Sequence, residues 1–385
     1  MNLRVLMLSP YFESHGGGVE AVAGHLARGL TTRFTDLTWM AANIDSVPSA
    51  YAGITVRPMS AWNGIERYTG VPLPLWSWAA YRELRVQIGI CDVLVVHDTL
   101  YIAHLLAIAF ARSASKPVLL VQHVGDVPYS NPLAHALVRI GNATATRWAM
   151  NSVDRIVFVS RTVRAWFASR SDETIVKSEC LPNGVDIRIF GPATESQRTE
   201  IRCALGLDQS PVFLFVGRFV QKKGIALLRH LAVHNRDCIF AFAGHGPLDP
   251  AAGGHDNVRK LGRLASIELV KWYRAADYLL LPSYGEGFPL VVQEALACGL
   301  PAIVGSEIAA AYPELGAGLY GVDVSGTDLD IEPWRQALQR CLDRRCEFPA
   351  RIGFAAKAAT LWSWDSTIDR YATLIHSIAK HAPIT

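Results

Sequence analysis

The stretch DYLLLPSYGEGFPLVVQEALACGLPAIVG, from Asp277 to Gly305, contains one complete strand–helix–strand repeat. A leucine-rich run is followed by a glycine-containing loop, a segment of helical pattern and a second apolar run. Runs that are apolar at every position are typical of strands covered on both faces. The stretch therefore predicts two parallel strands joined by a helix.

The same repeat extends through the chain in two series, separated by helical patterns that include Leu75–Gln87. The predicted strands of the first series are RVLMLSP, TDLTWMAA, ITVRPM, DVLVVHD, PVLLVQHV and DRIVFVS. Those of the second are PVFLFVG, CIFAFAG, NVRKLGR, DYLLLP and PAIVG. Between the series, CLPNGVDIRIFGPATESQ concentrates proline and glycine, as linkers do.

This pattern predicts an α/β chain of two doubly wound, Rossmann-like parallel-sheet domains facing a cleft. We place the first domain at residues 1–185 and the second at residues 186–363. The amphipathic C-terminal segment, at about residues 364–385, is expected to form a helix that can pack back on the first domain.

Composition narrows the class of protein. A formal charge of +3 over 385 residues is too small to indicate nucleic-acid binding. Seven scattered cysteines without a C-x-x-C pair are typical of a reducing compartment. The N-terminus lacks a signal-peptide pattern, and the longest apolar run, Thr99–Ala111, is shorter than the roughly 18 residues that span a bilayer. We expect a cytoplasmic protein.

The first half leaves room for contact with the cytoplasmic face of a membrane. Residues 1–185 carry 16 basic and 13 acidic side chains, whereas residues 186–385 carry 21 of each. The segment Leu75–Gln87 contains two tryptophans and two arginines, which suits a membrane interface. Core packing explains the same segment equally well, so both interpretations stay open.

Two glutamates, Glu286 and Glu294, flank the start of the predicted helix. Eight residues span about 12 Å and a little over two turns, so Glu294 returns to nearly the face at which the helix begins. Pro289 suits the first helical position, which leaves the amides of Gly287, Phe288 and Leu290 able to bind an anion or sugar hydroxyls. Alternatively, Glu286 only complements the helix dipole, and Glu294 is a partly buried residue paired with an arginine.

Two cations follow another predicted strand. Arg218 comes directly after PVFLFVG, and Lys223 lies five residues further on. A cation about 4 Å from a phosphate contributes on the order of 4 kcal/mol at an effective dielectric of 20, so the pair could hold a diphosphate without a metal. Arginine and lysine in loops are, however, often only solvated.

The first half offers glycines and a histidine at equivalent positions. Gly17 and Gly18 follow the first strand and open a helix, where they allow a phosphate or sugar to approach the backbone closely. The spacing is not G-x-G-x-x-G, which disfavours a nicotinamide cofactor. His123 ends another strand and is predicted to face the cleft, with a purely structural role as the alternative.

These motifs resemble one family, the retaining GT-B glycosyltransferases of family 4. The resemblance covers nearly the whole chain and rests on the following motifs: EGFPLVVQE, GGVE, GR…KKG, PNGVD, AGHGP and SIELVKWYRAADYLLLPSYGEGFP. It implies retaining transfer of a sugar from a nucleotide-diphosphate donor. We expect a hexose from a UDP- or GDP-sugar and a glycan acceptor, in cell-envelope, exopolysaccharide or lipopolysaccharide biosynthesis. The basic first half and Leu75–Gln87 suit a lipid-linked acceptor. The resemblance implies no metal cofactor.

The resemblance also implies a role for each site residue. Arg218 and Lys223 neutralise the departing diphosphate, Glu294 binds the ribose, and Glu286 holds the transferred sugar. The remaining positions would contact the donor from both domains: His123, Gly17, Gly18, Arg263, Leu264, Gly287, Phe288, Pro289 and Leu290.

One segment departs from the family. Relatives commonly carry glycines before a Pro-Glu pair, whereas this chain has Ala309–Ala311 before Pro313. Three alternative functions stay open on the same architecture: a sugar-nucleotide epimerase, a phosphorylase, and a non-catalytic glycan-binding subunit.

Overall fold

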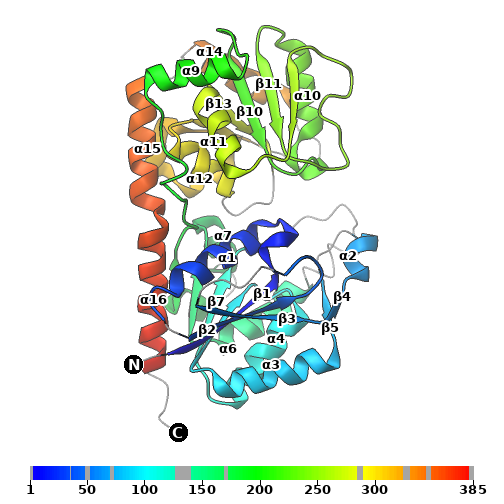
Figure 1. Cartoon of the computed structure of the whole chain (residues 1–385), viewed down its shortest axis with the longest axis vertical. Helices are drawn as coiled ribbons and strands as arrows, with labels where there is room; N and C mark the ends of the chain where they lie inside the picture. Colours follow the sequence, from blue (N-terminus) through cyan, green and yellow to red (C-terminus); the bar gives the residue numbers. More distant parts are fainter. Residues whose placement is uncertain are drawn as a thin grey trace. The chain divides into compact units, whose positions relative to one another are not determined.

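The computed structural model describes residues 3–34, 36–47, 53–69, 73–125, 140–168, 172–283, 289–323, 330–343 and 348–380. The chain divides into two compact units. Unit 1 comprises Met1–Asn183 together with Trp364–Thr385, and unit 2 comprises Gly184–Ser363. Each unit is built on a parallel sheet, as the uniformly apolar runs predict (Figure 1).

Unit 1 contains a seven-stranded sheet in the order β3-β2-β1-β6-β7-β8-β9. Every neighbouring pair is parallel. The strands are β1 (Arg4–Tyr11), β2 (Asp36–Ala42), β3 (Ile54–Met59), β6 (Val93–His97), β7 (Val118–Gln122), β8 (Arg155–Phe158) and β9 (Ser178–Cys180). The short β9 extends the sheet beyond the six predicted strands.

Helices cover both faces of this sheet because the strands are apolar on both sides. Alternate residues of β1 enter two different cores, Leu6 and Leu8 on one face and Val5 and Met7 on the other. Helices α1 (Gly18–Leu30) and α16 (Trp364–Lys380) pack on the second of these faces. The first is covered by α3 (Trp78–Ile90), α4 (Ile102–Ser113), α6 (Arg147–Ser152) and α7 (Arg161–Ala168).

The C-terminal helix α16 is part of unit 1 and lies beside α1 (Figure 1). Gly29 of α1 permits the approach, since a Cβ there would stand 2.0 Å from Ile368 Cδ1. Two ion pairs join α16 to the rest of unit 1. Arg33 donates to Asp369 of α16 at 2.8 Å, and Arg370 of α16 donates to Glu179 of β9 at 2.7 Å.

One predicted helix begins later than its sequence pattern indicates. Leu75–Trp76 forms β5, which pairs antiparallel with β4 (Ala61–Trp62), and α3 begins only at Trp78. Ser77 sets this start because its side chain accepts a hydrogen bond from the Ala80 amide and caps the helix.

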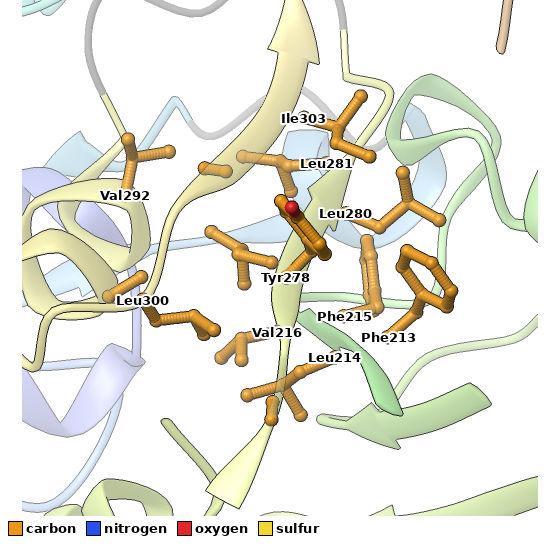
Figure 2. Close-up of a cluster of buried hydrophobic side chains, with 14 of the residues drawn as sticks. Phe213, Leu214, Phe215, Val216, Tyr278, Leu280, Leu281, Val292, Leu300 and Ile303 are labelled. Atoms are coloured by element: carbon orange, nitrogen blue, oxygen red, sulfur yellow. The ribbon is translucent and has the colours of Figure 1, made fainter. Parts of the chain in front are cut away.

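Unit 2 contains a six-stranded parallel sheet in the order β12-β11-β10-β13-β14-β15. Its strands are β10 (Val212–Val216), β11 (Ile239–Ala243), β12 (Val258–Gly262), β13 (Tyr278–Leu281), β14 (Ala302–Gly305) and β15 (Leu319–Val322). All residues of β10 and β13 are buried. Figure 2 shows their aromatic and aliphatic side chains packed with Val292 and Leu300 from the helix that follows β13 and the turn after it.

Helices connect the strands of unit 2 except between β11 and β12, where the described chain contains only turns. The helices of unit 2 are α9 (Glu195–Ala204), α10 (Ile225–His234), α11 (Ser266–Ala275), α12 (Leu290–Ala297), α13 (Ser306–Ala311), α14 (Ile331–Asp343) and α15 (Phe348–Trp362). The alanines that depart from the family pattern form the last turn of α13. A Cβ on Gly321 would stand 3.0 Å from the Ala309 Cβ, so this turn packs tightly on β15.

Within the described ranges, no helix is both long and apolar enough to cross a membrane.

Candidate active site

In both sheets the strand order changes direction beside the strand that comes first in the sequence, β1 in unit 1 and β10 in unit 2. In unit 2 the chain runs from β10 to β11 and β12 on one side, and then returns to place β13 on the other side. The loops after β10 and β13 therefore separate at the carboxyl edge, which is where open α/β sheets bind ligands. Unit 1 has the equivalent point between β1 and β6.

The two predicted cations of unit 2 both follow β10. Arg218 is exposed and comes two residues after the strand. Lys223 is half-buried and ends a single 3₁₀ turn, Gln221–Lys223. Its side chain runs back toward the strand, since a Cβ built on Gly217 would stand 3.8 Å from Lys223 Cε. The fold of this loop thus returns Lys223 to the end of β10, next to the position of Arg218.

Two glycines of the AGHGP segment allow the loop after β10 to pack closely against the loop after β11. A Cβ at Gly244 would stand 1.9 Å from the Gly217 carbonyl oxygen, and one at Gly246 would stand 2.5 Å from the Phe219 carbonyl oxygen. Both glycines also have positive φ angles, 141° and 157°. The Phe219 amide donates to the His245 carbonyl at 2.7 Å, so the loops after β10 and β11 are fastened together.

The predicted pair Arg263 and Leu264 follows β12 at the same edge. Gly262 ends that strand with φ at 71°, and its carbonyl accepts a hydrogen bond from the Gly244 amide at 2.7 Å. Arg263 is exposed, and Leu264 is half-buried against the core of unit 2. Three neighbouring loops therefore form one continuous rim.

Glu294 lies in the second turn of α12 and is bonded to a tyrosine. The buried Tyr273 hydroxyl on α11 donates to Glu294 Oε2 at 2.8 Å. Burial raises the pKa of Glu294 to about 7, against an ordinary value of 4.5, and the Tyr273 hydrogen bond opposes the shift. The arginine partner considered from the sequence is not observed in the described part of the chain.

This raised pKa predicts a pH-dependent stability. Between pH 4.5 and 7 the unfolded chain loses the Glu294 proton while the folded protein keeps it, so the free energy of unfolding falls as pH rises. Glu294→Gln removes this contribution, which amounts to at most about 3 kcal/mol. We expect the variant to gain stability relative to the native protein between pH 5 and pH 8, as measured by urea unfolding.

The matched control is Glu332→Gln at an exposed position of unit 2. Arg335 lowers the pKa of Glu332 to about 2, so this substitution should not become more favourable as pH rises. Parallel pH profiles for Glu294→Gln and the native protein would contradict the assigned environment of Glu294.

The loop before α12 is only partly described. Glu286, Gly287 and Phe288 lie outside the described residues. Pro289 is the N-cap of α12, in an extended conformation with ψ at 132°, and Leu290 is the first helical residue. The helix therefore starts one residue later than predicted.

In unit 1, His123 follows β7 and is buried next to His97 of β6. Its Nε2 atom lies 2.9 Å from His97 Nδ1. Its backbone amide donates to Asp98 Oδ1 at 2.8 Å, and the Val124 amide donates to the same oxygen. Asp98 has φ at 64°, a left-handed conformation that only a few per cent of non-glycine residues adopt.

Burial keeps these histidines neutral near pH 7. It lowers the pKa of His123 to about 3 and that of His104 to about 4, and lowers the pKa of His97 well below its ordinary value. Burial raises the pKa of Asp98 to about 7, opposed by the two amide hydrogen bonds. The neutral His123 ring can therefore form a hydrogen bond with a ligand but does not supply a positive charge.

The predicted glycines of unit 1 differ in their surroundings. Gly17 is the N-cap of α1, and a Cβ there would stand 2.1 Å from Glu20 Oε2. A Cβ at Gly18 would have no neighbour within 4 Å among the described residues. Gly18 therefore offers open backbone for a close approach, whereas Gly17 makes room for the buried Glu20 carboxylate.

A second polar cluster at this edge escaped the sequence analysis. His15 lies between two carboxylates, with Nδ1 2.8 Å from Asp45 Oδ2 and Nε2 3.2 Å from Glu66 Oε1. Its ring stacks on Tyr11 with centroids 3.8 Å apart, and the Tyr11 hydroxyl donates to Glu66 at 2.8 Å. Tyr11 ends β1, His15 lies in the 3₁₀ turn Glu13–His15, Asp45 lies in the loop after β2, and Glu66 lies in α2 (Gly64–Thr69). Because these segments are far apart in the sequence, no sequence motif indicates the cluster.

Comparisons with known proteins identify the family of this chain. Residues 16–188 match the family described as "Glycosyltransferase Family 4", and residues 210–343 match "Glycosyl transferases group 1". Sucrose-phosphate synthase from Thermosynechococcus elongatus superposes with a TM-score of 0.77 at 17% identity, covering 98% of this chain and 100% of that one.

Curated relatives are glycosyltransferases by name. A GDP-mannose-dependent monoacylated alpha-(1-6)-phosphatidylinositol monomannoside mannosyltransferase of Corynebacterium glutamicum is 29% identical over 62% of this chain and 66% of its own length. A D-inositol 3-phosphate glycosyltransferase of Frankia alni is 28% identical over 82% of each chain. Several other matches span only about half of the relative.

The two Rossmann-like units and the two family matches together place the chain among the glycosyltransferases. The chain belongs to the GT-B glycosyltransferases of family 4.

Proposed function

We propose that the protein transfers a hexose, with retention of configuration, from a UDP- or GDP-sugar to a lipid-linked glycan acceptor. Such a reaction would belong to cell-envelope, exopolysaccharide or lipopolysaccharide biosynthesis, at the cytoplasmic face of the membrane. One observation carries the proposal. The side chain of Lys223 lies beside Gly217 at the end of β10, so its charge is next to the position of Arg218.

The two cations would bind the donor diphosphate. Negative charge grows on this group as the sugar–oxygen bond breaks, so preorganised cations stabilise the transition state more than the ground state. They would do this without a divalent metal. The transferred sugar would pass through an oxocarbenium-like state, with the acceptor approaching from the face that the diphosphate leaves.

The remaining site residues would orient the substrates. Glu294 would accept hydrogen bonds from the ribose, and Glu286 from the transferred sugar. Carboxylates suit vicinal hydroxyls, and neither glutamate is proposed as a nucleophile. Gly18, Gly287 and Phe288 would let backbone amides approach the donor, as would Pro289 and Leu290 at the start of α12, while Arg263 and Leu264 would line the base pocket.

The polar cluster around His15 would meet the acceptor. Its carboxylates and imidazole suit a hydroxyl-rich ring, and it lies at the ligand-binding edge of unit 1. The relatives support this choice of acceptor, since their names specify inositol phosphate and a phosphatidylinositol mannoside.

Turnover with a panel of UDP- and GDP-hexoses in EDTA tests this proposal. We expect transfer to continue in EDTA, and the product's anomeric proton coupling to show the same configuration as the donor. Complete loss of activity that added magnesium restores would contradict the metal-independent chemistry. An inverted product would contradict retention.

A further inference from the structure

The outer side of unit 1 carries large exposed apolar side chains on three adjacent helices. Helices α3, α4 and α6 pack side by side over one face of the sheet (Figure 1). Trp78 on α3 is 80% exposed. The other exposed apolar residues of these helices are Val86, Ile90, Ile102 and Trp148. Apolar exposure of this extent marks an interaction surface.

The charges on the same helices are almost all positive. The exposed arginines are Arg82, Arg85, Arg112 and Arg147. The single acidic residue of the three helices, Glu83, accepts hydrogen bonds from Arg57 at 3.1 Å and from Gln87 at 2.9 Å. No acidic side chain of these helices therefore offsets the four exposed arginines.

On α3 the two kinds of residue share one helical face. The exposed residues recur at intervals of three or four along the helix, so they form one stripe: Trp78, Arg82, Arg85, Val86 and Ile90. The buried residues Ala80, Leu84 and Ile88 form the opposite stripe. Basic and aromatic residues on the outer face of an amphipathic helix suit the boundary between lipid headgroups and acyl chains.

We infer that the exposed face of α3, α4 and α6 binds the anionic surface of a phospholipid bilayer. The tryptophans and aliphatic side chains enter the headgroup boundary, while the arginines extend to lipid phosphates. The charge favours a lipid surface over an ordinary protein interface, because protein interfaces are depleted of charge at their centres. This inference adds a binding surface to the proposed function and rests on it only for the lipid-linked acceptor.

Cosedimentation of the full chain with lipid vesicles tests the surface without donor or acceptor. The vesicles are phosphatidylcholine alone, or phosphatidylcholine with roughly one third phosphatidylglycerol, whose charge attracts basic residues. We expect binding only to the anionic vesicles, weakened at about 0.5 M salt. Each arginine contributes about fivefold to partitioning, so Arg82→Glu/Arg85→Glu should weaken it about 30-fold or more.

A tryptophan variant and a control in unit 2 separate the apolar contribution of the surface from its charge. Trp78→Ser/Trp148→Ser should lower binding about tenfold while keeping its salt dependence. The control Arg236→Glu/Arg340→Glu changes two exposed arginines of unit 2 and should bind normally. Thermal melting confirms that each variant is folded.

Two results would overturn the inference. One is a native protein that ignores anionic vesicles. The other is a set of surface variants that bind vesicles normally but change mass by light scattering, which would identify a protein–protein interface. A protein that binds vesicles yet transfers no sugar would refute the proposed function and leave the surface intact.

Discussion

Lys223→Ala is expected to lower kcat/KM by about 10³-fold while leaving the melting temperature nearly unchanged. A cation about 4 Å from a phosphate contributes on the order of 4 kcal/mol at an effective dielectric of 20, and each 1.4 kcal/mol is tenfold. Lys223 ends a single 3₁₀ turn and has no place among the buried core residues, so its loss should not unfold unit 2. Steady-state kinetics with the preferred donor measures the effect.

The adjacent Lys222 provides the control for this prediction. It lies in the same turn and carries the same charge, but the proposal gives it no contact with the diphosphate. Lys222→Ala should stay within about twofold of the native rate, and Lys223→Arg should recover part of the lost activity because it keeps the charge. Equal effects of the two alanine variants would reduce the role of Lys223 to general surface charge.

His123→Ala is expected to lower turnover about 10²-fold, and His97 controls how His123 presents its proton. His97 Nε2 is buried and has no hydrogen-bond partner among the described residues. A proton there would leave a buried donor unsatisfied, at a cost of about 1–3 kcal/mol. We therefore assign the His97 proton to Nδ1, from which it donates to His123 Nε2. The proton of His123 then lies on Nδ1, where it can donate to a ligand oxygen.

Two amide substitutions at His97 test this assignment. The nitrogen of an asparagine side chain occupies nearly the place of His Nδ1, whereas that of glutamine occupies nearly the place of Nε2. His97→Asn should keep most activity, and His97→Gln should lose about tenfold. Long-range ¹H–¹⁵N spectra should show His123 neutral and protonated on Nδ1 from pH 5 to 8. A His123 ring that titrates near pH 6.5, or that carries its proton on Nε2, would contradict the assignment.

The two parallel sheets could be predicted from the sequence because the signal is local. Each run such as VFLFV or YLLL is apolar at every position, and covered parallel strands require this. The boundaries of elements were less accurate where a single polar atom decides them. Ser77 delays α3 by three residues, although the apolar pattern of Leu75 and Trp76 suits a helix equally well.

The candidate site was predictable only where its residues follow strands directly. Arg218 could be placed in this way, since a residue directly after a parallel strand lies at the carboxyl edge of the sheet. The partners of Glu294 and His123 could not, because Tyr273 and His97 come from other elements and meet them only in the folded chain. The cluster of His15, Asp45 and Glu66 was missed for the same reason, because the three residues belong to different segments that meet only in the folded chain.

A crystal structure of the full chain with uridine or guanosine diphosphate tests the central claim most directly. The account predicts that the diphosphate contacts Arg218 and Lys223 at the end of β10 and that the ribose hydroxyls bind Glu294. An ordered nucleotide that contacts neither cation would contradict it.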